Sequence, residues 1–335
     1  MARIAEVGRE RTLADAIGLE LGPFLATGEG PVRWCGPIVD GGLAAFLGRP
    51  ESFKSMAVVQ FGLAAAAGGS WLGIELGEPR PFVYLAAEKS AATIRDRLAR
   101  MTERIRPVAP VRIVHRAGVT FGDRASWDRV VELVTEYGPR TFVAGDTIAS
   151  LAGPGFDENS GRDMATVLAA LRRLGDVGAT VAAVHHPAKH GEGTGGIRLR
   201  GHSSLWGEVD GTVEFTRPDR AVEAGMVRIE PKDGDLRLIA FRWDRETFLL
   251  EPEAGLLAVT PSTIAEVVDA LYAGQPLSAD RIRAEFPGHG RSAFLDRLRD
   301  TVTAGLVARI GGGRTSGYVP VPRIGRAGRI PDEPV

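Results

Sequence analysis

The feature that most constrains the fold is a regular alternation of short apolar runs with amphipathic helical patterns, over the first two thirds of the 335-residue sequence. The apolar runs indicate buried strands at Leu43–Leu47, Pro81–Ala87, Val111–His115, Thr141–Ala144 and Thr180–His185. The segments between them place apolar residues at helical spacing; they are Lys54–Ala67, Ala91–Met101, Ser126–Tyr137 and Gly161–Leu174. This repetition predicts an α/β fold whose mainly parallel sheet is covered on both faces.

The pattern changes after about Ser203 to shorter β-rich segments. Antiparallel strands that extend the same sheet are predicted at Gly211–Thr216, Val227–Pro231, Leu236–Phe241 and Thr247–Leu250. A linker is expected at Glu251–Gly255. Beyond it, helices are predicted at Ser262–Tyr272, Ser278–Glu285 and Arg291–Ala304, and a hairpin with a glycine-rich tip at Leu306–Ile310 and Tyr318–Val321. Three helices followed by such a hairpin are typical of a winged helix.

The sequence therefore divides into four parts. We expect an N-terminal segment (1–33), a large α/β domain (34–252), a small C-terminal winged-helix domain (258–322) and a tail (323–335). The Arg, Gly and Pro content of the tail predicts disorder.

Composition excludes several classes of protein. The 41 Lys and Arg balance 42 Asp and Glu, which excludes a polycation that coats nucleic acid or lipid but leaves room for a local basic patch. A single cysteine, Cys35, excludes a disulfide scaffold and a Cys-rich zinc module. The most apolar stretch, Met56–Gly69, is too short to span a bilayer, and the N-terminus has no apolar secretory region. We expect a cytoplasmic protein without a membrane partner.

The strongest chemical signal is the segment GRPESFKS, directly after the first strand and opening the first helix. Its residues are Gly48, Arg49, Pro50, Glu51, Ser52, Phe53, Lys54 and Ser55. In this strand–loop–helix context the pattern predicts a phosphate loop for ATP, in which backbone N–H groups hold the phosphates. Lys54 would contact the β- and γ-phosphate oxygens, and the Ser55 hydroxyl would bind Mg²⁺. The alternative is an ordinary strand–turn–helix with a surface lysine.

Phe53 departs from the usual pattern, which has glycine before the lysine. Its Cβ must point away from the nucleotide, and a positive φ at this position would be strained.

Polar residues follow three of the apolar runs, where a parallel sheet would gather them at one edge. Glu88 follows PFVYLAA, Asp146 follows TFVAG, and His185 and His186 follow TVAAV. Asp146 would bind Mg²⁺ through its water shell, Glu88 would orient or deprotonate the attacking water, and His186, or else His185, would contact the γ-phosphate. Glu88 and Asp146 could instead be helix N-terminal caps.

The segments GRPESFKS, YLAAEKSAATIRDRL, TFVAGDTIASL, DENSGRDM, AAVHHPAKHG and RGHSSLWGEVDG together resemble the RepA-like hexameric replicative helicases, a branch of the RecA-like ATPases found in plasmids and phages. The resemblance runs from about Trp34 to Phe248. It implies a RecA-like P-loop fold, a homo-oligomeric ring, ATP hydrolysis between subunits and single-stranded DNA in a central channel. It also implies a trans-acting arginine finger, for which Arg200 or Arg198 is the expected residue, since the family's position falls on Asp210.

Two regions are candidates for DNA contact. The glycine-rich stretch after His186 carries Lys189, Arg198 and Arg200, and would grip backbone phosphates in the channel, unless it is an ordinary surface loop. A zinc site at its histidines is disfavoured because no cysteine is near.

The winged helix is the second candidate. It offers Arg291 and Arg297 on its third helix and Arg314 on its wing for duplex DNA, although Asp296 and Asp300 share that helix. Winged helices also serve as protein-docking modules.

The leading hypothesis is an ATP- and Mg²⁺-dependent DNA helicase or translocase. A DNA-binding ATPase switch without unwinding, such as a loader, recombination mediator or regulator, is the alternative. A monomeric small-molecule kinase is a third possibility, but it leaves the winged helix without a role.

Overall fold

The computed structural model describes residues 34–116, 118–186, 207–217, 222–233, 237–253, 261–272, 274–286, 291–311 and 317–321. The expected N-terminal segment (1–33) and tail (323–335) lie outside the described residues. The same is true of four candidate DNA-contacting or finger residues, Lys189, Arg198, Arg200 and Arg314.

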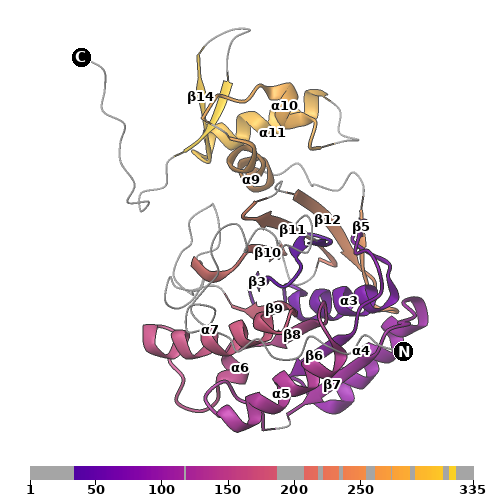
Figure 1. Ribbon diagram of the computed structural model, residues 1–335. Helices are drawn as coiled ribbons and strands as arrows, with labels where there is room; N and C mark the ends of the chain where they lie inside the picture. Colours follow the sequence, from indigo (N-terminus) through magenta and orange to yellow (C-terminus); the bar gives the residue numbers. More distant parts are fainter. Residues whose placement is uncertain are drawn as a thin grey trace, which may run out of the picture. The chain divides into compact units, whose positions relative to one another are not determined.

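The described residues form a nine-stranded sheet in the order β13–β12–β11–β10–β3–β9–β8–β6–β7 (Figure 1). The strands are β3 (Leu43–Gly48), β6 (Phe82–Ala86), β7 (Val111–His115), β8 (Phe142–Asp146), β9 (Thr180–His185), β10 (Gly211–Thr216), β11 (Ala224–Pro231), β12 (Arg237–Trp243) and β13 (Leu250–Pro252). Pairing from β10 through β3 to β7 is parallel, and pairing from β10 to β13 is antiparallel. The expected α/β fold with a mainly parallel sheet is confirmed.

The expected linker is wrong at its first residues. Glu251 and Pro252 belong to β13, whose Leu250 and Glu251 pair with Trp243 and Arg242 of β12. Proline is compatible with this position because β13 is an edge strand, where one row of backbone groups needs no ladder partner.

Helices cover both faces of the sheet (Figure 1). They are α3 (Lys54–Ala67), α4 (Ala91–Arg104), α5 (Arg124–Tyr137), α6 (Ile148–Ala152) and α7 (Gly161–Asp176). Alternate residues of β3 face opposite sides: Phe46 packs in the core with α3 and α4, whereas Leu47 packs in the core with α5, α6 and α7. Because both sides are buried, these strands are continuous apolar runs rather than alternating ones.

Helix α3 runs through the interior and carries one polar side chain at its centre, Gln60. Its amide Nε2 donates to the carbonyl of Leu250 at 2.9 Å, and its Oε1 accepts from the Leu250 N–H at 2.8 Å. Gln60 thus supplies the hydrogen bonds that a further strand would give to β13, and both of its buried polar atoms are satisfied.

Several small elements were not expected from the sequence. The ribbons β1 (Trp34–Cys35) with β2 (Ile38–Val39) and β4 (Ser70–Trp71) with β5 (Ile74–Glu75) have two-residue strands, and α6 has five residues. Segments this short contain no repeat of hydrophobic period, so a pattern search cannot detect them.

The C-terminal elements are α9 (Pro261–Leu271), α10 (Ala279–Arg283), α11 (Arg291–Thr303) and the antiparallel pair β14 (Val307–Ile310) and β15 (Gly317–Pro320). They enclose an apolar core that includes Ile264, Phe286, Phe294 and Leu298. Met226 of β11 and Ala240 of β12 belong to the same core. Within the described part of the chain, no helix combines the length and apolar character needed to cross a membrane.

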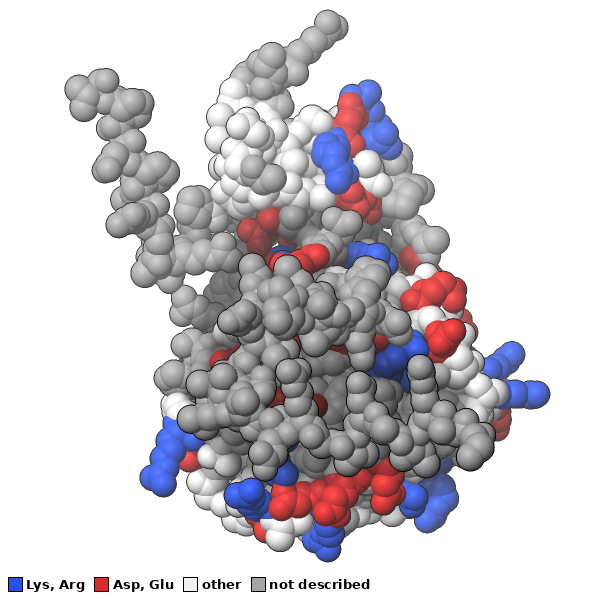
Figure 2. All heavy atoms as spheres, in the orientation of Figure 1, with Lys and Arg blue, Asp and Glu red and all other residues white. Residues whose placement is uncertain are grey.

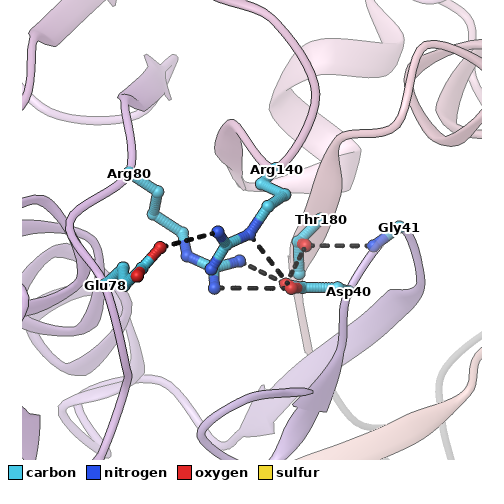
Figure 3. Close-up of polar contacts among 6 residues, drawn as sticks. All are labelled: Asp40, Gly41, Glu78, Arg80, Arg140 and Thr180. Carbon is cyan, nitrogen blue, oxygen red and sulfur yellow. Dashed lines mark hydrogen bonds and ion pairs between the residues drawn. The ribbon is translucent and has the colours of Figure 1, made fainter. Parts of the chain in front are cut away.

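A buried ionic cluster ties the amino-terminal ends of four strands (Figure 3). Asp40, just before β3, pairs with Arg80, just before β6, and with Arg140, just before β8, at 3.4 Å. Thr180, the first residue of β9, donates to Asp40 Oδ1 at 3.2 Å and accepts from the Gly41 N–H at 3.1 Å. The Arg80 side chain is 1% exposed, so its charge depends on Asp40 for compensation.

Asp40→Ala should therefore lower the free energy of unfolding by about 3 kcal/mol, because it leaves the buried Arg80 guanidinium without its partner. Urea denaturation followed by circular dichroism measures this change. The control is Asp96→Ala, which breaks an exposed ion pair with Arg100 and should cost less than about 0.5 kcal/mol. Equal losses in the two variants would contradict a stabilising role for the cluster.

Candidate active site

The loop between β3 and α3 is tight. Gly48 ends β3, and a Cβ built there would overlap the Ser52 hydroxyl and lie 2.9 Å from the carbonyl oxygen of Phe215. The Ser52 N–H donates to the carbonyl of Arg49 at 3.2 Å, which closes a turn within the loop. Gly48 is thus required because the Ser52 side chain and the Phe215 backbone leave no room for a Cβ.

Phe53 has the positive φ that was expected to be strained at this position. Its φ is 71°, and Glu51 of the same loop has φ 65°. The Phe53 side chain points into an aromatic slot formed by Phe241 and Trp243 of β12, with ring centroids 5.9 and 5.2 Å away. Burial of the ring, which is 5% exposed, offsets the backbone strain at a position where glycine would have none.

Lys54 is the first residue of α3 and is 4% exposed. Its ammonium donates to the carbonyl of Arg49 at 3.2 Å. Burial lowers the pKa of Lys54, and the carboxylates of Asp146 and Glu88 oppose that shift. An anion bound in the loop would further favour the charged form, since an opposite charge compensates the lost hydration.

Asp146 is the last residue of β8 and is buried between two hydroxyl donors. Its Oδ1 accepts from Ser55 Oγ at 3.1 Å, and its Oδ2 accepts from Tyr84 OH at 2.7 Å. Burial raises the pKa of Asp146, and the hydrogen bonds from Tyr84 and Ser55 oppose this. The alternative role as a helix cap is excluded, because Thr147 caps α6 through a hydrogen bond from the Ser150 N–H.

Glu88 lies two residues beyond β6. Thr147 Oγ1 donates to its Oε1 at 3.0 Å, and His186 Nε2 lies 3.7 Å from the same oxygen. The neighbouring His186 and then Thr147 hold the pKa of Glu88 at about 2, although burial acts in the opposite direction. A helix-cap role is excluded here too, because Ser90 caps α4 by accepting from the Thr93 N–H.

Parallel pairing gathers these groups. β9 lies between β3 and β8, and β8 lies between β9 and β6, so the loop, His186, Asp146 and Glu88 all emerge at the carboxyl edge of the sheet. His185 is fully buried as the last residue of β9, which leaves His186 as the histidine beside Glu88. The structure thus brings together Lys54, Ser55, Glu88, Asp146 and His186.

The groups present fit a bound nucleotide with Mg²⁺. Ser52 Oγ and His186 Nδ1 are buried, and neither has a hydrogen-bond partner among the described residues. Ser55 and Asp146 supply two hard oxygen ligands in direct contact, which suits Mg²⁺ held through a hydroxyl and a water shell.

Three contacts of the site were not anticipated. Tyr84 binds Asp146, Thr147 binds Glu88, and Arg217 places its guanidinium 4.4 Å from the centroid of the Phe53 ring. Tyr84 lies within an apolar run where a tyrosine is also an ordinary core residue, so the sequence carried no distinguishing signal. Thr147 directly follows Asp146, and this position just beyond the strand was the only sign in the sequence that it could contact Glu88.

The candidate DNA-contacting arginines of α11 are exposed and paired with acids. Arg291 lies 3.2 Å from Asp280, and Arg297 lies 3.3 Å from Asp300. Basic and acidic groups lie next to one another on the face seen in Figure 2. Asp210, on which the resemblance placed the arginine-finger position, lies at the amino edge of the sheet, where its Oδ2 accepts from the Leu43 N–H at 2.8 Å.

Comparison with known proteins identifies the family. A family model for an AAA domain (AAA_25) matches residues 25–192, half of the chain. The chain therefore belongs to the AAA domain family, which confirms the expected relationship to RecA-like P-loop ATPases. It is a nucleotide-binding protein of an ATPase family.

Comparisons with solved structures give weaker similarities. A DnaB-like replicative helicase, solved in a study of its interactions with primase, has 13% sequence identity and a TM-score of 0.49, over 69% of this chain and 66% of that chain. The chain thus spans just under two thirds of that helicase. The RadB recombinase has 14% identity and a TM-score of 0.45, over 64% of this chain and 91% of that chain. No curated protein matches the sequence.

Because the pKa of Glu88 is low in the folded protein, its contribution to the free energy of unfolding depends on pH. A carboxyl group whose pKa is about 2 in the folded protein, against 4.5 ordinarily, stabilises the fold above pH 4.5, and this contribution is lost as the pH falls toward 2. The stability difference between the native protein and Glu88→Gln should therefore shrink over that interval, as measured by urea denaturation at several pH values. A difference that stays constant with pH would mean that Glu88 is not held in its ionised form by His186 and Thr147.

Proposed function

We propose that this protein is an ATP-dependent DNA helicase or translocase of the RepA-like, RecA-fold group, which acts on single-stranded DNA in replication. The observation that carries its ATP-hydrolysing part is the 3.1 Å hydrogen bond between Ser55 and Asp146, with Glu88 on the same sheet edge. A phosphate-loop hydroxyl that is hydrogen-bonded to an aspartate at the end of a strand is the arrangement that binds Mg²⁺ beside a nucleoside triphosphate.

Each residue of the site then has a defined role. The loop Gly48–Ser55 surrounds the phosphates with backbone N–H groups, and Lys54 compensates the charge of the β- and γ-phosphate oxygens. Ser55 and Asp146 hold Mg²⁺, which supplies further charge neutralisation when bound. His186, beside Glu88, contacts the γ-phosphate.

Glu88 orients the attacking water. Its pKa of about 2 makes it ionised at neutral pH but a weak base, because efficient proton abstraction needs a pKa near the working pH. Phosphoryl transfer depends mainly on positioning, so an ionised carboxylate that accepts a hydrogen bond from water is sufficient.

The proposal extends to a homo-oligomeric ring, a hexamer. Arg200, or Arg198, of a neighbouring subunit acts as the arginine finger, and Lys189 with these arginines contacts single-stranded DNA in the channel. The segment that carries them follows β9 and His186, and so it begins at the edge of the sheet that carries the site.

We further propose that residues 258–322 form a winged-helix domain, beside an ATPase domain of residues 34–252. Three helices followed by an antiparallel pair support this assignment. Duplex DNA would contact Arg291, Arg297 and Arg314. Because Arg291 and Arg297 are already paired with acids, this contact would be weak and sensitive to salt.

A second candidate function is a DNA-binding ATPase switch without unwinding. The observation that favours it is the engagement of Glu88 by Thr147 and His186 within one subunit. Turnover would then depend on a signal that frees the carboxylate. A strand-displacement assay on a forked substrate separates this candidate from a helicase.

Lys54→Ala should reduce steady-state ATP hydrolysis by about 100-fold or more, because the charge that compensates the phosphates is lost. Glu88→Gln should retain ATP binding and lose about 100-fold in turnover, because only the positioning of water is affected. Exposed residues of α5 give the matched controls, Arg129→Ala and Glu132→Gln, which should leave both properties unchanged. Undiminished turnover in Lys54→Ala would disprove the phosphate loop, and loss of binding in Glu88→Gln would make Glu88 a structural residue.

Single-stranded DNA should stimulate ATP hydrolysis several-fold in the native protein, and should not restore the hydrolysis that Lys54→Ala loses. The measurement is the steady-state ATPase rate with and without an oligonucleotide, accompanied by gel filtration with and without nucleotide. A monomer whose hydrolysis ignores DNA would instead support a small-molecule kinase or another DNA-independent ATPase.

A further inference from the structure

One side chain contacts both strained residues of the phosphate loop. Arg217 stacks its guanidinium over the Phe53 ring, 4.4 Å from the centroid, and its NH1 donates to the carbonyl oxygen of Glu51 at 3.1 Å. Glu51 and Phe53 are the two loop residues with positive φ, at 65° and 71°. A single cation therefore meets the two places where the loop backbone is least favourable.

The fold determines where Arg217 lies. It directly follows β10, which pairs in parallel with β3 so that Phe215 lies opposite Gly48. The residues that follow these two strands thus emerge together at the carboxyl edge of the sheet. A second hydrogen bond, of 2.7 Å from Arg217 Nε to the carbonyl of Val222, also holds the guanidinium.

The energies involved are comparable. A left-handed conformation is unfavourable for a residue with a Cβ, and glycine would adopt it without this cost. A cation over an aromatic ring and a charge-assisted hydrogen bond to a carbonyl each contribute an amount of the same order. Arg217 and the aromatic slot of Phe241 and Trp243 together can thus hold Phe53 in the conformation that glycine adopts freely.

We propose that Arg217 is a positioning residue for the phosphate loop, which acts through Phe53 and the Glu51 carbonyl and replaces the conformational freedom of the missing glycine. This inference rests on the proposed function for its consequence, nucleotide binding. Its structural part can be tested without nucleotide.

The first experiment is hydrogen exchange of the nucleotide-free protein with Arg217→Met, which keeps an unbranched side chain and removes the cation and its donors. Exchange of the Ser52 N–H, which donates to Arg49, should accelerate roughly tenfold as the loop opens more often. The matched control is Arg245→Met, because Arg245 lies 5.7 Å from the Trp243 ring of the same slot and pairs with Glu223. It should leave the loop unchanged.

The second experiment is a double-mutant cycle with Phe53→Gly, read by the affinity for a fluorescent ATP analogue. Arg217→Met should weaken binding about tenfold in the native background, and by no more than about threefold in the Phe53→Gly background, where the loop no longer needs the stack. The same reduction should appear in the exchange of the Ser52 N–H. If Arg217→Met does not fold, Arg217→Lys replaces it, and the loss of planar stacking should give the same pattern with smaller effects.

Unchanged exchange in Arg217→Met would overturn the proposal. Equal losses of affinity in both backgrounds would also overturn it, because Arg217 would then act on the nucleotide directly. Faster exchange in Arg217→Met, together with a native protein that binds no ATP analogue, would support the positioning role while refuting the proposed ATPase function.

Discussion

Parallel pairing of neighbouring strands is the constraint on which the site depends, because strands that run the same way deliver their last residues to one edge. β3, β9, β8 and β6 contribute the loop, His186, Asp146 and Glu88 in this way, although these residues are far apart in the chain. The opposite edge is held by Asp40, which joins the strand beginnings to Arg80, Arg140 and Thr180. The ion pairs that stabilise the sheet thus lie at the beginnings of the strands, and the functional groups lie at their carboxyl ends.

The site itself is a set of charges partly withdrawn from water. Lys54, Asp146 and Glu88 are close enough to influence one another, and the hydroxyl groups of Tyr84, Ser55 and Thr147 satisfy the carboxylates. Because these hydroxyl groups are already oriented toward the carboxylates, the carboxylates can bind a ligand without large rearrangement of the site. Because a buried charge costs free energy unless it is compensated, these groups favour a ligand whose charges complement theirs.

Much of the fold could be predicted from the sequence, because buried parallel strands and long amphipathic helices have strong periodic patterns. Val111–His115, Thr180–His185 and Lys54–Ala67 were predicted with their observed bounds. The strand-end residues Glu88 and Asp146 followed from the same logic. Tyr84, Thr147 and Arg217 did not, since their roles arise from register between strands that are distant in sequence, which no local pattern encodes. The short ribbons could not be predicted because they contain no hydrophobic period. The strand expected at Thr247–Leu250 lies instead at Leu250–Pro252, so that it takes up the first two residues of the expected linker.

The aromatic slot has a consequence for how such a loop can arise. A bulky residue at position 53 needs Phe241, Trp243 and Arg217 to contact its ring, whereas a glycine at this position would adopt the same backbone conformation without them. The order of substitution in evolution is therefore constrained: Phe241, Trp243 and Arg217 must be present before glycine is replaced by Phe53. Once Phe53 is present, loss of Phe241, Trp243 or Arg217 would leave its strained backbone without support, so these four positions are expected to evolve together. A search for the glycine-bearing motif alone would therefore miss proteins whose phosphate loop has this form.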